Sequence, residues 1–274
     1  MIKDVMVSLD GTPADEVRLA AVADIAEYFD VHVTGLFLSV LPLLAPSEWD
    51  GIGARTAAQI LQEARENAEK VAATVRRRLG RLQLPTELRR IDVASGSQGD
   101  VAAREARGAD VFVGLRPNGV SSESTQVIES VLFETGRHLF LAPQGGPGPA
   151  AFDRILFAWN GSREATRAAA EGMPYLLKAE TVDVVIVQDS SLTAQISGTD
   201  IVEHLLHHGV GAVLHEVKPR AGGVAATLIE EAKERSSDLI VMGAYGHSRL
   251  REWLLGGATY QLIHQAPIPL VVAH

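Results

Sequence analysis

Cysteine is absent from this chain of 274 residues, which excludes disulfide bonds, thiolate metal sites and cysteine nucleophiles. Aromatic residues are few, at 5%, and no run of about 18 consecutive apolar residues, the length that spans a bilayer, occurs. The first residues, MIKDVMVSLD, lack the basic segment and the longer apolar segment of a secretory signal peptide. We therefore expect a soluble, globular, cytoplasmic protein.

Positive charge is also in short supply, with 25 Lys and Arg residues against 34 Asp and Glu residues and a formal net charge of -9. Such a surface does not attract polyanions in general, so we expect neither nucleic acid nor a membrane as a partner. Hydrophobic residues, by contrast, make up 46% of the chain. That is enough for about two domains, each with its own core.

Short apolar runs alternate with longer segments of helical period, which is the pattern of strand–helix units in a parallel sheet. In the first half we expect strands at IKDVMVSL, VHVTGLFLSV, TELRRIDVA, ADVFVGL and HLFLAP. One helix should end near Asp30, and a long amphipathic helix should run from about Ala54 to Leu82. The apolar stripe of the long helix is expected to be core, and it consists of Ile60, Leu61, Ala64, Ala68, Val71, Ala72, Val75 and Leu79.

The same order of elements begins again after the segment QGGPGPA, whose glycines and prolines suit a linker. Strands are expected at RILFAWN, TVDVVIV, AVLHEV, DLIVMG and IPLVVAH, with a helix between each pair, the last from about Leu250. The halves therefore form a repeat of about 130 residues, divided into domains at 1–147 and 148–274. Asp10-Gly11-Thr12 lies opposite Asn160-Gly161-Ser162, and ADVFVGLR lies opposite SDLIVMGAYG.

A glycine-rich segment, GAYGHSRLREWLLGGAT, follows the apolar run DLIVM of the second half. In open α/β sheets, ligands sit outside the carboxyl ends of the strands, where the strand order reverses. Gly243 and Gly246 allow close approach of the backbone and positive φ, so that successive amides can form an anion-binding concavity. Gly256, Gly257 and Thr259 add small residues and a hydroxyl that can donate to a phosphate.

The spacing of Gly243, Gly246 and Gly256 is similar to the pattern G-x2-G-x9-G-(S/T) of ATP-binding universal stress proteins. Together with the repeated order of elements, it makes the chain resemble the tandem, two-domain form of that family. The resemblance implies two flavodoxin-like (Rossmann-like, adenine nucleotide alpha hydrolase-like) α/β domains, each a five-stranded parallel sheet flanked by helices. It also implies that HLFLAP and IPLVVAH pair within one chain, as single-domain relatives pair in dimers; further homodimers stay open.

The same resemblance implies a stress-responsive sensor or regulator that binds ATP, or ADP or AMP, in its second domain, with Mg²⁺ as a companion and at most slow hydrolysis. Carried over position by position, it places Gly243, Gly246, Gly256, Gly257 and Thr259 at the phosphates, Ala158 and Asn160 at the nucleoside, and Val187 at the base, with Met242 and Ala258 as further cofactor-binding candidates. Asn160 departs from the usual Asp and loses its charge, and Gly257 replaces a preferred Ser or Thr. No catalytic or metal-binding residue is assigned.

The first half departs from this pattern in the opposite way. Its loop reads GLRPNGV, where Gly114 is not followed by a second glycine and Pro117 removes a backbone donor. Asp10, however, occupies the family's acidic position. We therefore expect at most one good nucleotide site in the chain, in the second half.

Several features admit more than one interpretation. The glycines after DLIVM also suit a plain strand-to-helix turn with tight helix packing. The run Ser121 to Thr125 suits a helix N-cap as well as a phosphate, and Trp159 suits packing as well as a base. His204 and His208 share a helix face without a third zinc ligand that the sequence can place. Two rival functions are a nucleotide-free, chaperone-like scaffold and an adenine nucleotide hydrolase.

Overall fold

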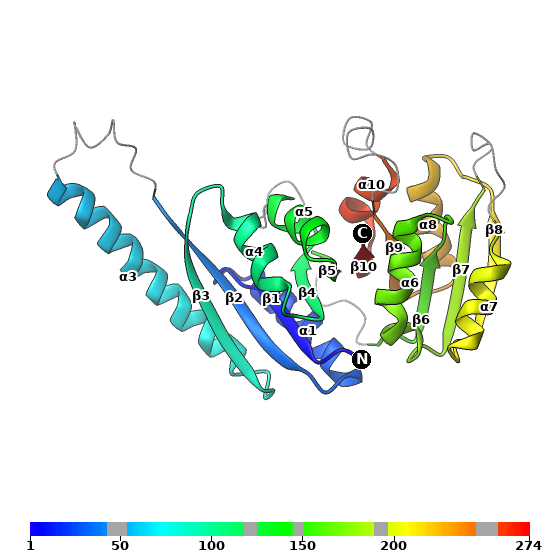
Figure 1. The fold of residues 1–274 in the computed structure, drawn as a ribbon, viewed down its shortest axis with the longest axis horizontal. Helices are drawn as coiled ribbons and strands as arrows, with labels where there is room; N and C mark the ends of the chain where they lie inside the picture. Colours follow the sequence, from blue (N-terminus) through cyan, green and yellow to red (C-terminus); the bar gives the residue numbers. More distant parts are fainter. Residues whose placement is uncertain (43–53, 118–124, 145–150, 189–196, 245–256) are drawn as a thin grey trace.

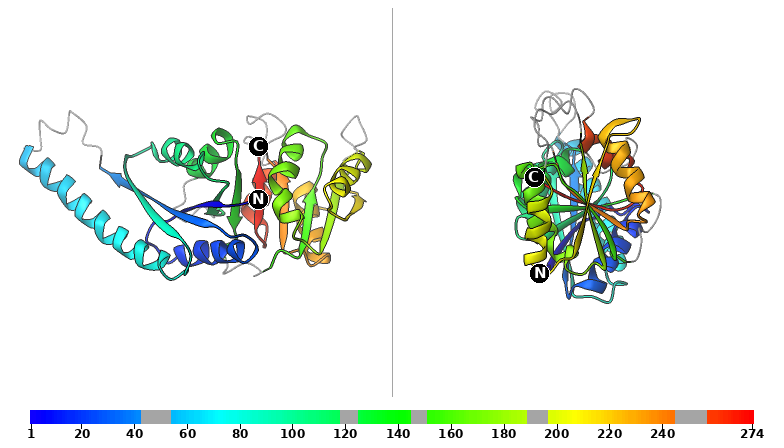
Figure 2. Two further views of the ribbon diagram at one scale, coloured as in Figure 1. Left: turned by 60° about the horizontal axis from the view of Figure 1, so that its bottom comes forward. Right: turned by 90° about the vertical axis from the view of Figure 1, so that its right-hand side faces the viewer.

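The structure is a computed structural model that describes residues 1–42, 54–117, 125–144, 151–188, 197–244 and 257–274. It is built on one sheet of ten strands, with helices on both faces (Figure 1). The strands fan out about the long axis of the molecule, as the twist of a large open sheet requires (Figure 2).

The elements of the first half follow the predicted order. They are β1 (Asp4–Ser8), α1 (Asp15–Tyr28), β2 (His32–Leu41), α3 (Ala54–Leu79), β3 (Thr86–Ala94), α4 (Gln98–Ala106), β4 (Val111–Leu115), α5 (Thr125–Glu134) and β5 (His138–Ala142). The described elements of the second half repeat that order. They are β6 (Arg154–Ala158), α6 (Arg163–Leu176), β7 (Thr181–Val187), α7 (Thr199–His207), β8 (Ala212–Val217), α8 (Gly223–Glu234), β9 (Leu239–Gly243), α10 (Ala258–Gln265) and β10 (Leu270–Ala273).

The strands of each half are parallel to one another, and the order across the sheet is β3-β2-β1-β4-β5-β10-β9-β6-β7-β8. The two halves meet where β5 and β10 pair antiparallel, with Phe140 opposite Val271. These are the strands HLFLAP and IPLVVAH that the family resemblance names. In each half the order reverses beside the first strand, between β1 and β4 and between β6 and β9. Those two places are the switch points at which ligands bind in open α/β sheets.

Alternation along the strands builds a hydrophobic core on each face of the sheet. On one face Val7, Val113 and Phe157 pack under residues of α1, α6 and α7. On the other face Phe112, Leu156 and Met242 pack under residues of α4, α5, α8 and α10. Each switch point therefore lies between helices of opposite faces.

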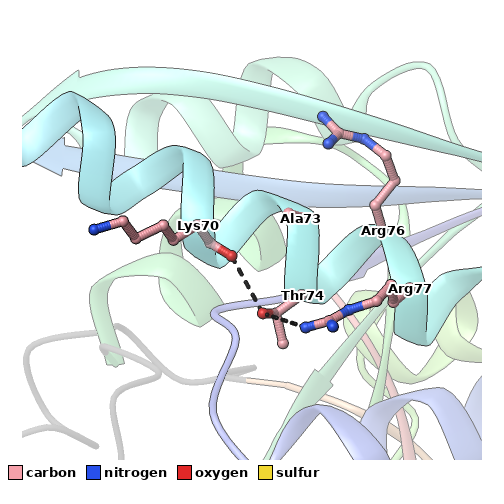
Figure 3. Close-up of a pocket in the computed structure, with 5 residues that line it drawn as sticks. All are labelled: Lys70, Ala73, Thr74, Arg76 and Arg77. Carbon is pink, nitrogen blue, oxygen red and sulfur yellow. Dashed lines mark hydrogen bonds between the residues drawn. The ribbon is translucent and has the colours of Figure 1, made fainter.

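The long helix α3 is less buried than its apolar stripe predicts. Ala68, Ala72, Val75 and Leu79 are buried, whereas Ile60, Leu61, Ala64 and Val71 are only partly buried. An open hollow on its surface is lined by Lys70, Ala73, Thr74, Arg76 and Arg77 (Figure 3). Because all five come from one helix, the hollow is a feature of the solvated helix face.

The junction between the halves combines aromatic packing with a buried polar cluster. Phe152 packs against Tyr28, and Tyr28 in turn accepts the Phe152 backbone amide at its hydroxyl, 2.8 Å away. Nearby, His138 of β5 lies 3.1 Å from a Glu171 carboxylate oxygen and 3.2 Å from the Tyr175 hydroxyl, both on α6. The cluster joins a strand of the first half to a helix of the second.

Half-buried Asp24 on α1 makes the stability of this fold depend on pH. Burial raises its pKa from 3.8 to about 6, and the charge of Glu27 adds to the rise. A raised carboxyl pKa means that the folded state holds the proton more tightly than the unfolded state. The stabilisation is therefore complete below pH 3.8 and is lost as the pH rises through about 6.

We expect Asp24→Asn, which cannot ionise, to raise the free energy of unfolding at pH 7 by about 1 kcal/mol, a value reduced for the partial exposure of the group. The gain should vanish well below pH 3.8, where the aspartate is protonated in both states. Urea denaturation of both proteins across this range measures it. A gain that is the same at every pH would contradict the assigned burial.

Candidate functional site

The switch point of the second half lies at the carboxyl ends of β6 and β9. Ala158 at the end of β6 is paired with Met242, one residue before Gly243 at the end of β9. α6 begins here on one face of the sheet, and α10 packs on the other face. The residues that the family resemblance assigns to the nucleoside and to the first phosphate contact therefore come together.

The loop between β6 and α6 has a defined polar structure. Gly161 adopts a φ of 69°, which glycine reaches without strain. Asn160 accepts the Ser162 amide at its Oδ1, 3.1 Å away, and the Ser162 hydroxyl caps α6 by accepting the Ala165 amide at 3.1 Å. Asn160 is exposed, so the rest of its side-chain amide faces solvent.

Gly243 holds the first turn of α6 against the sheet. A Cβ added to Gly243 would lie 2.4 Å from the backbone carbon of Glu164 and 2.5 Å from the nitrogen of Ala165. Further along α6, an added Cβ at Gly172 would lie 2.7 Å from Val241 of β9. Both glycines therefore let the helix approach β9 closely, which favours the packing interpretation for Gly243 and leaves its backbone at the site.

Glu164 is a site residue that the sequence alone does not single out. It lies in the first turn of α6 beside Gly243, it is buried, and its Oε1 accepts the Arg163 Nε at 3.2 Å. Burial acts to raise its pKa, but hydrogen bonding to its own backbone amide and the charge of Arg163 outweigh burial, so the pKa lies below its ordinary value. Acidic residues are common in the first turn of helices, so the sequence gives no reason to single out Glu164.

The remaining predicted residues are distributed around the same edge of the sheet. Val187 ends β7, the neighbour of β6, and its side chain is buried. Met242 is also buried, in the core shared with α8 and α10. Gly257 is the N-cap of α10, followed by half-buried Ala258 and buried Thr259 in its first turn. Gly246 and Gly256 lie outside the described residues.

The corresponding place in the first half is filled by charged side chains of the protein itself. The loop there has the same turn, with Gly11 at a φ of 81° and the Thr12 amide donating to Asp10 Oδ1 at 2.8 Å. The other carboxylate oxygen of Asp10 lies 3.2 Å from the guanidinium of Arg18. Arg18 is 1% exposed and also pairs with fully buried Asp15 at 2.9 Å.

Helix α3 completes this closure. Arg78 donates to the Thr12 carbonyl at 2.6 Å and pairs with Asp15 at 2.9 Å. Val71 lies over the loop so closely that a Cβ on Gly11 would be 2.5 Å from its Cγ1. The acid that the family resemblance assigns to a nucleotide is here part of an internal ion-pair cluster, which we define as Asp10, Asp15, Arg18 and Arg78.

Among the described residues of the second half, this cluster has no counterpart. Along the aligned repeat, Ala165 and Ala168 stand where the first half has Asp15 and Arg18, and both alanines are fully buried. Asn160 stands where the first half has Asp10, and it is exposed. The same loop is thus closed by ion pairs in one half and open to solvent in the other.

The pairing of the strands corrects one detail of the predicted comparison between the halves. Leu115, and not Gly114, corresponds to Gly243, because Leu115 pairs with the last residue of β5 as Gly243 pairs with the last residue of β10. Leu115 is buried. The first half therefore has a bulky side chain where the second half has a glycine, and residue Arg116 corresponds to Ala244.

Other candidates from the sequence are also placed. Trp159 is partly buried and packs near Phe157, with ring centroids 5.7 Å apart. His204 and His208 are exposed on α7 with ring centroids 4.6 Å apart. Within the described ranges, no group of three or more His, Asp or Glu side chains is placed to hold a metal ion. Residues 118–124, which include most of the serine run, lie outside those ranges.

The length and the hydropathy of a helix decide whether it can cross a membrane. In the part of the chain that the structure describes, no helix is both long enough and apolar enough to cross a bilayer.

Comparison with known proteins links this architecture to one family. Residues 151–274 match the model of the universal stress protein family. The universal stress protein Slr1230 of a Synechocystis species is 26% identical over 120 residues, which cover 43% of this chain and 41% of that protein. The match thus spans less than half of the relative's length.

Solved structures extend the likeness of fold to nearly the whole chain. A universal stress protein from Archaeoglobus fulgidus, 15% identical, superposes over 98% of this chain and 95% of its own with a TM-score of 0.69. A putative universal stress protein from Pseudomonas aeruginosa, 14% identical, covers 99% of this chain and 93% of its own with a TM-score of 0.58. The C-terminal half of the chain thus matches the universal stress protein family, and nearly the whole chain shares the fold of these solved structures.

Proposed function

We propose that this chain is a cytoplasmic stress-response protein that binds ATP, or ADP or AMP, in a C-terminal domain of residues 148–274. The observation that carries the proposal is the contrast between the two switch points. The first is closed by the ion-pair cluster, whereas the loop of the second presents exposed Asn160 beside the ends of β6 and β9. The glycine spacing that resembles the family's ATP motif follows β9 in the same half.

The chemistry of the described residues suits the polar parts of a nucleotide. The exposed amide of Asn160 can bond a ribose hydroxyl while its Oδ1 keeps the Ser162 amide. The first turns of α6 and α10 present backbone N–H groups and the positive ends of two helix dipoles, which favour phosphate. The nucleotide in this proposal is a signal that the domain senses.

A protein site for Mg²⁺ does not fit the described residues. Mg²⁺ takes oxygen ligands, mainly carboxylates and phosphates. The Asn160 carbonyl oxygen is occupied by the Ser162 amide, and Glu164 is held by Arg163. In the proposal, Mg²⁺ therefore accompanies the phosphates without a carboxylate from this loop. Hydrolysis is slow at most, because the lowered pKa of Glu164 makes it a weak general base.

The first test is the identity of any nucleotide that stays with the purified protein. We expect mass spectrometry of the denatured protein to detect ATP, ADP or AMP, and we expect added ATP to raise Tm. Repeated absence of nucleotide together with no thermal shift would support the alternative, a nucleotide-free scaffold. ADP formed in proportion to enzyme and lost in Gly246→Val would instead revive a hydrolase.

A sharper prediction concerns Asn160, which is exposed and can be changed without disturbing the core. Asn160→Asp restores the family's acid, and Asp10 shows that a carboxylate accepts the same turn amide. A charge-assisted bond to a ribose hydroxyl is stronger by about 1 kcal/mol, so the variant should bind AMP about fivefold more tightly. Asn160→Ala should weaken binding by a similar factor.

The matched control is Asp10→Asn in the first half, which makes the reverse change in the closed loop. Its affinity for AMP, measured by isothermal titration calorimetry, should equal that of the unaltered protein. Loss of AMP binding in Asp10→Asn, with no effect of either change at Asn160, would move the site to the first half and contradict the proposal.

A further inference from the structure

A buried arginine stands at the switch point of the first half, and no described residue pairs with its charge. Arg116 follows β4 directly and is 8% exposed. Its Nε and Nη1 have no hydrogen-bond partner in the described part of the chain, and no carboxylate there forms an ion pair with it. Burial alone lowers the pKa of its guanidinium. A buried cation without a counter-ion is costly, and native proteins seldom keep one without a use.

The position of Arg116 is set by the sheet. Its amide donates to the Ala142 carbonyl at 3.1 Å, so the extended backbone of β4 continues through it. Because successive side chains of a strand point to opposite faces of the sheet, the side chain of Arg116 lies on the same face as Phe112. Helices α4 and α5 cover that face. The corresponding residue of the second half, Ala244, is buried in the core of that same face.

Two features make this place attractive to an anion. The ten-residue helix α5 follows β4 in the chain and begins at the same edge of the sheet, so its positive end adds to the charge of Arg116. The guanidinium also offers a planar fork of donors that matches the oxygens of a phosphate. At the adjoining end of β1, the ion-pair cluster engages the carboxylate of Asp10, which the family resemblance assigns to the nucleotide.

We propose that the N-terminal half binds a small tetrahedral oxyanion of the phosphate class at Arg116. The site is distinct from the proposed nucleotide site, and it takes a phosphate without a nucleoside. The ligand supplies the negative charge that the described residues around Arg116 do not.

The test compares the full-length protein with Arg116→Met, which keeps the bulk of the side-chain stem and removes the charge. Both are purified in a phosphate- and sulfate-free buffer and unfolded thermally over a series of inorganic phosphate concentrations, with sodium chloride at matched ionic strength as reference. We expect phosphate to raise the Tm of the unaltered protein by several degrees beyond the chloride effect. Arg116→Met should lose that rise and should have the higher Tm of the two without phosphate.

The matched control is Arg104→Met, which removes an arginine whose side chain is 61% exposed on α4. It should keep the full response to phosphate. Arg116→Lys serves if the methionine variant does not fold: it keeps the charge but lacks the fork, so its affinity for phosphate in calorimetry should fall at least tenfold.

Some results would overturn the proposal. A phosphate response that persists unchanged in the Arg116 variants places the anion elsewhere, and no response in the unaltered protein shows that Arg116 is a structural residue. Because AMP binding at Asn160 is measured separately, failure here leaves the proposed function standing. An AMP affinity that falls with Arg116→Met, while the change at Asn160 has no effect, would overturn both.

Discussion

Replacing Gly243 with alanine is expected to lower the free energy of unfolding by about 3 kcal/mol, the upper end of the usual cost of overpacking. The added Cβ would lie within 2.7 Å of three backbone atoms of Glu164 and Ala165. Backbone atoms cannot rotate away as a side chain can, so α6 would have to shift as a body. Equilibrium denaturation in urea measures the loss.

The matched control for this change is Gly211→Ala. Apart from Gly211 itself and its two neighbours in the chain, no heavy atom of the described residues lies within 4 Å of the position of its added Cβ. The alanine there should leave the free energy of unfolding within about 0.5 kcal/mol of its original value. Equal stabilities for the two variants would mean that α6 is not seated against β9 as described, and would weaken the account of the loop at Asn160.

Replacing Arg18 with alanine should be about as damaging, at roughly 3 kcal/mol, because it removes a guanidinium that pairs with buried Asp15 and with Asp10. Asp15 is fully buried and depends on Arg18 and Arg78 for its charge. Asp10 would also lose its guanidinium partner. Denaturation at pH 7 measures the cost.

The second half suggests the companion variant, because it carries alanine at both corresponding positions. Asp15→Ala/Arg18→Ala should lose at least about 1 kcal/mol less than the sum of the two single changes, since neither charge is then stranded. Strictly additive losses would show that Asp15 and Arg18 do not act as a pair. In that case the ion-pair cluster would not explain the closure of the first loop.

The fold follows from the sequence where apolar runs are bounded by clear turns. The runs TELRRIDVA, TVDVVIV and AVLHEV are β3, β7 and β8 residue for residue. Other ends differ by a few residues, as fraying and capping decide them. The start of the last helix, expected near Leu250, falls outside the described residues, and α10 as described begins at Ala258.

The sites were less accessible to sequence reasoning because they depend on contacts between distant segments. Arg18 and Arg116 carry charge, and a charged residue in a helix or loop ordinarily indicates exposure. Arg18 is buried where α3 packs on the first loop, and Arg116 is buried at the carboxyl end of β4. A local sequence pattern reports neither arrangement. Gly243 was assigned to phosphate from its spacing, and its close contact with α6 emerged only from the packing.

The antiparallel pair of β5 and β10 belongs to one covalent chain. Two separate chains joined by such strands would part on dilution, at a point set by their dissociation constant. Here the connecting peptide fixes an effective concentration that no dilution can lower. The contact of Phe152 with Tyr28 lies close to that connection, and it further limits the relative positions that the two halves can take. The assembled sheet, and whatever its two switch points bind, should therefore be the same at scarce and at abundant expression.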